Sequence, residues 1–225
     1  MALQEPTRVL AIRHGETEWN VQTRLQGQTD VPLNRRGEDQ VRRLAEAIRR
    51  EPLTAVYSSD LARAARTAEA IGRALGLPVH HETGLRERAF GVFEGFTHLE
   101  VGERWPLENQ RWRQRDIDFG PEGGEVLSDF DARCVATATR LSAAHPGETI
   151  ALVAHGGVLD CLYRAASRIE LQAPRTWKIG NASINRLLYT PQGFTLVGWS
   201  DDHHLEDAPL DELADGDEPL RVKRA

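Results

Sequence analysis

The sequence predicts an α/β fold, a three-layer α/β/α sandwich in which a mostly parallel central sheet is covered by helices on both faces. Two short and continuous apolar runs, at residues 9–12 and 150–154, are typical of central strands that are buried on both faces. Between them, segments with the periodicity of strands and of helices alternate along the chain. Such alternation favours parallel strands that are joined by crossover helices.

The first half of the chain supplies two strands and two helices in this order. A strand is expected over residues 8–14, and after a long loop a helix is expected to begin at Asn34, whose side chain can cap it. Residues 53–59 predict the second strand. Asp60 can cap the helix that follows, and Gly76 is expected to end that helix.

The second half begins with an irregular stretch and then returns to regular elements. Over residues 91–124 the periodicity weakens, and this charged stretch is expected to be an excursion that forms a lid over the functional face. A helix is expected over 125–144 and a second central strand over 148–157. Two closing strands are expected over 183–189 and 194–199.

No repeat or linker divides the chain, so a single domain is expected over residues 1–205. The remaining residues, 206–225, are acidic, then basic, and poor in large apolar side chains. They are expected to form a loosely attached C-terminal tail.

The composition excludes several classes of function. Of 225 residues, 40% are hydrophobic and 28% are charged, which is typical of a folded globular protein. The 28 basic and 34 acidic residues give a net charge of −6, which argues against nucleic acid or an anionic membrane as a partner. Neither Cys134 nor Cys161 lies in a metal-type spacing, so free thiols are expected. No signal-like leader or membrane-spanning run is present, and a cytoplasmic protein is expected.

Both central strands end in the same pair of residues. The first apolar run leads into His14 and Gly15, and the second leads into His155 and Gly156. Because ligands gather outside the carboxyl ends of parallel strands, the two histidines are expected to face one another across one crevice. A glycine after each histidine allows the backbone to approach a ligand closely.

At least one arginine side chain can reach this crevice in the predicted fold. Arg13 directly precedes His14, and the helix after the second strand carries Arg63 and Arg66. Guanidinium groups match phosphate oxygens in a fixed fork geometry, which the point charge of lysine does not provide. The sequence therefore predicts an anion site that contains a nucleophilic histidine.

Five segments resemble the histidine phosphatase superfamily, in its phosphoglycerate mutase-like branch, and they occur in that family's order: RHGETEWN, RLQGQTDVPLNRRG, SSDLARAARTAE, LRERAFGVFEG and LVAHGG. The resemblance covers nearly the whole domain and implies a phosphoglycerate mutase-like fold. Two further segments, NASINRLLY and HHLEDAPLDEL, are similar to the type B phosphoglycerate mutase homologues, many of which behave as phosphatases.

The resemblance implies a role for each matching residue. His14 is the nucleophile that takes the phosphoryl group on a ring nitrogen. Arg13, Arg63 and His155 hold the transferring group, whose charge spreads over its equatorial oxygens in the transition state. Glu87 protonates the leaving oxygen and later accepts a proton from water.

Further positions match the phosphate and substrate pocket of the family: Asn20, Gln26, Gly27, Gly156 and Arg113. The resemblance implies no metal and no cofactor, because side chains already supply the positive charge.

Some residues carry competing interpretations. Residues 110–115, QRWRQR, are either a phosphate clamp or a charged helix face. Glu87 lies between two arginines and could be a surface ion-pair partner of little energetic value. Arg66 is expected on a solvated helix face. The histidine pairs at 80–81 and 203–204 are expected at the surface, because adjacent histidines point in different directions and lack further metal ligands.

Three functions fit this set of residues: a phosphatase, a phosphoglycerate mutase and a non-catalytic binder of phosphorylated ligands. The intact catalytic positions argue against the binder. Glycolytic mutases of the family carry a longer excursion with paired arginines, whereas here Arg113 precedes Gln114 and Val126 replaces the usual serine. These differences favour a metal-independent phosphatase that hydrolyses a small phosphorylated metabolite through phospho-His14. The sequence decides neither the substrate nor the oligomeric state, although a homodimer is compatible with it.

Overall fold

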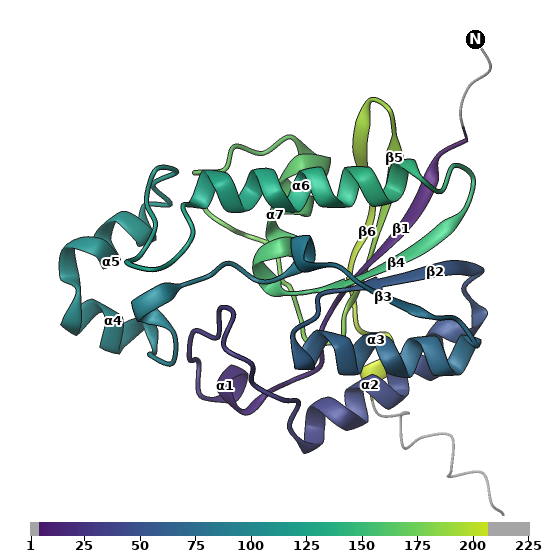
Figure 1. Cartoon of the computed structure of the whole chain (residues 1–225), viewed down its shortest axis with the longest axis horizontal. Helices are drawn as coiled ribbons and strands as arrows, with labels where there is room; N and C mark the ends of the chain where they lie inside the picture. Colours follow the sequence, from purple (N-terminus) through teal and green to yellow (C-terminus); the bar gives the residue numbers. More distant parts are fainter. Residues whose placement is uncertain (1–4, 207–225) are drawn as a thin grey trace, which may run out of the picture.

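The computed structural model describes residues 5–206, which are built around a six-stranded sheet with the order β3-β2-β4-β1-β5-β6 (Figure 1). The strands are Thr7–Arg13 (β1), Leu53–Ser58 (β2), Val79–His81 (β3), Thr149–Ala154 (β4), Ile184–Thr190 (β5) and Gly193–Asp201 (β6). Strands β1 to β4 are parallel, β5 is antiparallel to β1, and β6 is antiparallel to β5. Only β5 runs against the other strands, so the predicted mostly parallel sheet is confirmed.

Helices cover both faces of this sheet (Figure 1). The α-helices are Glu18–Val21 (α1), Arg35–Ala47 (α2), Ala62–Leu75 (α3), His98–Arg104 (α4), Pro106–Arg113 (α5), Leu127–Ala143 (α6) and Gly156–Ser167 (α7). Short 3₁₀ helices lie at Ile48–Arg50, Thr83–Leu85, Gly91–Phe93 and His203–Leu205. Helices α2 and α3 pack on one face, and α6 and α7 pack on the other. The predicted three-layer α/β/α sandwich is confirmed.

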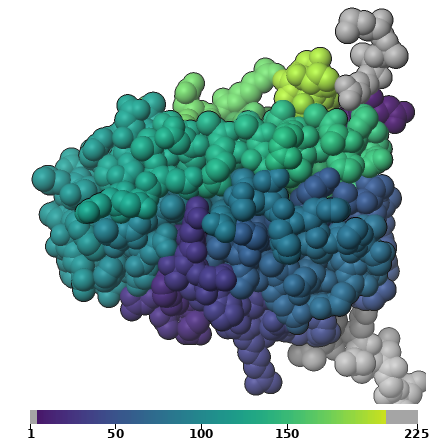
Figure 2. Space-filling view, in the orientation of Figure 1, coloured from purple at the N-terminus to yellow at the C-terminus, as the bar shows by residue number. Residues whose placement is uncertain are grey.

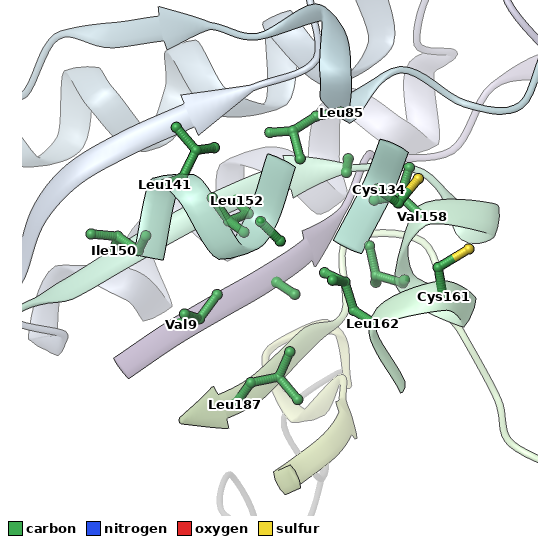
Figure 3. Close-up of a cluster of buried hydrophobic side chains, with 14 of the residues drawn as sticks. Val9, Leu85, Cys134, Leu141, Ile150, Leu152, Val158, Cys161, Leu162 and Leu187 are labelled. Carbon is green, nitrogen blue, oxygen red and sulfur yellow. The ribbon is translucent and has the colours of Figure 1, made fainter. Parts of the chain in front are cut away.

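The alternation of side chains along β1 shows why its apolar run is continuous. Val9 and Ala11 pack into the core beneath α6 and α7, whereas Leu10 and Ile12 pack into the core beneath α2 and α3. Figure 3 shows the first of these two cores, to which α6 and α7 contribute both cysteines. Both cysteines are buried free thiols, as predicted.

Helices α2 and α3 are capped differently at their N-termini. Asn34 caps α2 as predicted, because its Oδ1 accepts from the N–H of Gly37 at 2.8 Å. The predicted cap of α3 is wrong: the carboxylate of Asp60 accepts instead from the Nε of Arg86 at 2.7 Å. An ion pair has therefore taken the side chain that could have capped the helix. The N–H of Ala62 donates to Asp30 at 2.7 Å.

Residues 91–124, named here the lid segment, extend from one end of the sheet (Figures 1 and 2). The segment contains α4 and α5 and has an apolar cluster separate from the two cores of the sandwich. This cluster contains Leu25, Phe90, Val92, Phe93, Phe96, Val101, Trp105, Trp112 and Phe119. The weak periodicity of the sequence follows from this arrangement, because these side chains pack on one another rather than on the sheet. Closure of the segment as a lid stays a prediction.

Two further expectations from the sequence concern the C-terminal tail and a membrane-spanning segment. The expected C-terminal tail, 206–225, lies outside them except for its first residue, Glu206. No helix within residues 5–206 is both long enough and apolar enough to cross a membrane.

Candidate active site

Three adjacent parallel strands, β2, β4 and β1, end at the same edge of the sheet and are followed by Ser59, His155 and His14. The ladder continues one residue past the strands, because the N–H of Ser59 donates to Val153 O and that of His14 to Ala154 O, both at 3.0 Å. The imidazole rings of His14 and His155 lie with their centroids 5.1 Å apart, tilted by 56°. The predicted pairing of the two histidines is therefore confirmed.

His14 is held as a neutral imidazole with one free nitrogen. Its Nδ1 lies 2.7 Å from the carbonyl oxygen of Gly15, which can only accept, so Nδ1 carries the hydrogen and Nε2 keeps its lone pair. The ring is 3% exposed. Burial, reinforced by the charges of Arg63 and Arg13, holds the pKa of His14 well below its ordinary value. The ring can therefore act as a nucleophile at neutral pH.

Two guanidinium groups flank the histidines, with Arg63 fully buried and Arg13 partly buried. One nitrogen of Arg13 donates to Ile179 O at 2.6 Å, and Arg63 donates to Thr29 O at 3.0 Å and to Gly27 O at 2.7 Å. Burial lowers the pKa of Arg13 to about 10, so the group remains charged at neutral pH. The Nε atoms of Arg13 and Arg63 are both buried without a hydrogen-bond partner within residues 5–206.

The carboxylate of Glu87 lies against the first turn of α7. Its Oε2 accepts from the N–H of Gly157 at 3.0 Å, and its Oε1 accepts from the N–H of Arg88 at 2.9 Å. A Cβ atom on residue 157 would lie 2.2 Å from Oε1, so only glycine leaves room for this carboxylate. The guanidinium of Arg88 donates to carbonyl oxygens, and that of Arg86 pairs with Asp60. The interpretation of Glu87 as a surface ion-pair partner is therefore wrong.

The segment between β1 and α2 carries three of the predicted pocket residues, Asn20 in α1 and Gln26 and Gly27 in the loop after it. Asn20 accepts from the side chain of Asn181 at 3.2 Å, and Gln26 is buried. Gly27 has a φ of +52°, and a Cβ atom there would lie 2.0 Å from Glu94 Oε1. The carboxylate of Glu94 accepts hydrogen bonds from two backbone N–H groups of this loop, and these contacts hold the loop in place.

The glycines that follow the two histidines differ in what the packing around them requires, and their expected close approach to a ligand stays a prediction. A Cβ atom on Gly15 would meet Gly37 O at 2.8 Å and Val41 at 2.9 Å, so glycine lets this turn pack against α2. At Gly156 the nearest atom to an added Cβ is the Nε of Arg13 at 3.7 Å, an ordinary contact. Close packing therefore requires Gly15, and no contact within residues 5–206 requires Gly156.

A cavity of about 530 Å³ opens over these groups. The predicted site residues that line it are Arg13, His14, Asn20, Gln26, Gly27, Arg63, Glu87, Arg113 and Gly156. His155 is fully buried and lies behind the lining. Among the described residues, the cavity wall contains seven arginines and two carboxylates, which makes it suited to an anionic ligand.

The arginines whose role was open are divided between the cavity and the surface. Arg113 and Arg115 line the cavity, whereas Arg111 pairs with Asp116 at 2.7 Å. Residues 110–115 therefore face both the cavity and the surface, and their role as a phosphate clamp stays a prediction. Arg66 lies outside the cavity and pairs with both carboxylate oxygens of Glu38, each at 2.9 Å, as its expected place on the helix surface allows.

Sequence reasoning missed Ser59, Gly157 and Arg175, all of which contact or line this site. Ser59 could have been found, because it stands at the end of a predicted strand as His14 does. Arg175 stands in an irregular segment without any motif. Within residues 5–206, no group of three His, Cys, Asp or Glu side chains is arranged to hold a metal ion.

Comparison with known proteins agrees with this geometry. The family model described as histidine phosphatase superfamily (branch 1) matches residues 9–202. "Probable phosphoglycerate mutase GpmB" of Photorhabdus laumondii is 34% identical over 215 residues, which are 92% of this chain and 98% of that protein. The structure of a mycobacterial glucosyl-3-phosphoglycerate phosphatase with VO3 is similar, with a TM-score of 0.78 and 32% identity over 86% of this chain and 99% of that one.

A phosphoserine phosphatase mutant from Entamoeba histolytica in complex with phosphoserine has a TM-score of 0.80 and 26% identity, covering 89% of this chain and all of that one, 100%. The family model and the similarity over almost the full length of a mutase homologue lead to one conclusion. This chain belongs to branch 1 of the histidine phosphatase superfamily and has its phosphoglycerate mutase-like fold.

Proposed function

We propose that this protein is a metal-independent phosphatase that hydrolyses a small phosphorylated metabolite through a phosphohistidine on His14. The state of His14 carries the proposal: a buried neutral ring with Nδ1 committed to Gly15 O and Nε2 free. Around it, three buried nitrogens lack partners within residues 5–206: Nε of Arg13, Nε of Arg63 and Nδ1 of His155. A phosphoryl group offers the oxygen atoms that such donors need.

In the first step, Nε2 of His14 attacks phosphorus, and the bond between phosphorus and the ester oxygen breaks. Arg13, Arg63 and His155 stabilise the charge on the equatorial oxygens, so the required positive charge comes from side chains. Glu87 gives its proton to the leaving oxygen, which departs as an alcohol.

In the second step, water attacks the phosphorus of phospho-His14, and Glu87, now ionised, accepts the proton of that water. The bond between nitrogen and phosphorus breaks, and its electron pair returns to Nε2. Inorganic phosphate and the neutral imidazole are regenerated.

The remaining pocket residues are proposed to contact the phosphoryl group or the rest of the substrate: Asn20, Gln26, Gly27, Gly156 and Arg113. The guanidinium of Arg113 is exposed at the cavity and has no hydrogen-bonding or ion-pair partner among the described residues. Proteins of similar structure act on phosphoserine and glucosyl-3-phosphoglycerate, which supports a small phosphorylated metabolite as the substrate class. Both cysteines are free thiols, which supports a cytoplasmic protein.

A phosphoglycerate mutase is the second candidate, because that is the name of curated relatives. A mutase must keep the dephosphorylated intermediate in the cavity while it reorients, and must keep water away from phospho-His14. Arg113 precedes a glutamine rather than a second arginine, so a two-arginine grip on a carboxylate is lacking at this position. This difference favours hydrolysis.

The phosphatase is tested by trapping the intermediate. A quench with ³²P-labelled substrate is expected to leave a protein-bound label that is stable to alkali and lost in acid, as a phosphoramidate would be. The variant His14→Ala should trap none. Label that persists in this variant, or that is found on a serine, overturns the assignment. Ligand binding without any turnover would favour the non-catalytic binder.

A further inference from the structure

A buried serine at the end of β2 contacts the second histidine of the site. The Oγ of Ser59 lies 2.8 Å from Nε2 of His155, and both residues are fully buried. Because β4 lies between β2 and β1, His155 stands between Ser59 on one side and His14 on the other.

The hydrogen bonds around Ser59 leave its hydroxyl hydrogen a single acceptor. The N–H of Leu61 donates to Ser59 Oγ at 3.3 Å and occupies one of its lone pairs. The hydroxyl hydrogen needs an acceptor of its own, and among the described residues the structure offers it only Nε2 of His155.

The two neutral forms of His155 therefore satisfy this buried site to different extents. With the hydrogen on Nδ1, Nε2 accepts from Ser59, and only the Nδ1–H group is left without a partner. With the hydrogen on Nε2, that group donates to Ser59, and both the hydroxyl hydrogen and the Nδ1 lone pair are left unpaired. Because unpaired buried polar groups are costly, the first form is favoured.

We propose that Ser59 is a positioning residue that holds His155 in the tautomer with its hydrogen on Nδ1, ready to donate to a phosphoryl oxygen. The opposite tautomer would present a lone pair to an anionic oxygen and repel it. The tautomer follows from contacts within the protein, whereas the donation to phosphoryl oxygen rests on the proposed phosphatase function.

The low pKa of His155 is the reason why its tautomer matters. Burial and the nearby groups Arg63, His14 and Arg13 hold the pKa of His155 well below its ordinary value, so the ring is neutral at pH 7. A protonated imidazole would donate from both nitrogens whatever its neighbours, but a neutral one donates from a single nitrogen. The choice of nitrogen then decides whether His155 binds or repels the substrate.

The tautomer can be measured directly in the ligand-free enzyme by two-bond ¹H–¹⁵N NMR of the imidazole rings, with the signals of His155 assigned by their loss in His155→Gln. We expect Nε2 to show the shift of an unprotonated nitrogen and Nδ1 that of a protonated one. In Ser59→Ala, the hydrogen is expected to move at least partly to Nε2. A wild-type enzyme with its hydrogen on Nε2 overturns the proposal.

Ser58→Ala is the matched control. Ser58 is equally buried, but its Oγ donates to the backbone oxygen of Ser59 at 2.8 Å. Its removal deletes one buried hydrogen bond without changing the partner of His155. We expect the tautomer of His155 to stay unchanged in this variant, and a change there as large as in Ser59→Ala would refute the specific role of Ser59.

Kinetics test the donation to the phosphoryl group. With p-nitrophenyl phosphate, Ser59→Ala is expected to lower kcat/KM about 10-fold, the size of one lost hydrogen bond. In a His155→Ala background the same substitution should cost nothing further, because the group it positions is gone. Equal losses in both backgrounds would overturn the positioning role. If the wild-type protein hydrolyses no phosphate ester, the proposed function fails, and the NMR result still decides the tautomer.

Discussion

The substitution Gly157→Ala is expected to move the Glu87 carboxylate while the fold stays intact. The added Cβ atom would lie 2.2 Å from Oε1 of Glu87 and 3.0 Å from Cζ of Phe130. An ordinary contact begins at 3.4 Å, so the carboxylate oxygen has to withdraw by about 1.2 Å. Because this oxygen is the far end of a flexible side chain, the withdrawal costs little stability.

The loss of activity follows from this displacement. A misplacement of about 1 Å can lower a rate about 10²-fold, which lies within the range of about 10² to 10⁴ for a general acid or base. For an alkyl phosphate we expect kcat to fall about 10²-fold, equivalent to about 2.7 kcal/mol. The assay is steady-state phosphate release from glycerol 2-phosphate, with thermal unfolding of each variant measured in parallel.

Two comparisons make the result specific to Glu87. Gly156→Ala places the same methyl group one residue earlier, where its nearest neighbour is Arg13 at 3.7 Å and Glu87 is not displaced. Because Gly156 is itself a proposed pocket residue, this variant controls for the stability of the helix start and not for activity. Gly157→Ala in a Glu87→Gln background should cost little more, because the displaced group no longer transfers a proton. Full activity of Gly157→Ala, or an equal loss in the Glu87→Gln background, would refute the placement of the proton-transfer group.

Three more predictions concern the same site. Glu87→Gln should give a burst of nitrophenol from p-nitrophenyl phosphate, near one equivalent of enzyme. This leaving group needs no general acid, whereas the attack of water still needs the general base that the variant lacks. A time course without a burst would contradict the two roles of Glu87. The free energy of unfolding should decrease as the pH falls through about 6.5, because His14 and His155 bind protons there only in the unfolded state. This decrease should be smaller in His14→Gln, and an equal decrease in that variant would contradict the buried neutral ring. Phosphate release should far exceed conversion of 3-phosphoglycerate to 2-phosphoglycerate, with or without added 2,3-bisphosphoglycerate, and the reverse ranking would favour the mutase.

The sheet and the pair of histidines could be predicted because they follow from short-range patterns. Continuous apolar runs identify strands that are buried on both faces, and a polar residue directly after such a run must lie at the carboxyl edge of the sheet. His14 and His155 satisfy this rule, and so does Ser59, which the same rule would have included. The strand order itself depends on long-range packing, which no local pattern records.

Other features depend on competition between partners that are distant in sequence. Asp60 has the right type and place for a helix cap, but Arg86, which is 26 residues away, takes its carboxylate. Glycine is needed at position 157 because the carboxylate of Glu87, which is 70 residues away in sequence, occupies the space that a Cβ atom would fill. Local propensity takes no account of partners that are distant in sequence. The sequence alone therefore could not decide how α3 is capped or why residue 157 is glycine.

The separate apolar cluster of the lid segment has a consequence for how substrate preference changes. Trp112 of the lid segment stacks on Phe90, which directly precedes the segment, with the ring centroids 5.1 Å apart. Both side chains line the cavity, and they pack in a cluster that is separate from the two cores of the sandwich. Substitutions there alter the space available to the leaving group, while the strand ends that hold His14 and His155 keep their support. Selection or laboratory evolution can therefore vary recognition within residues 91–124 and retain the same phosphoryl chemistry, and exchange of this segment between relatives is the direct way to transfer a preference.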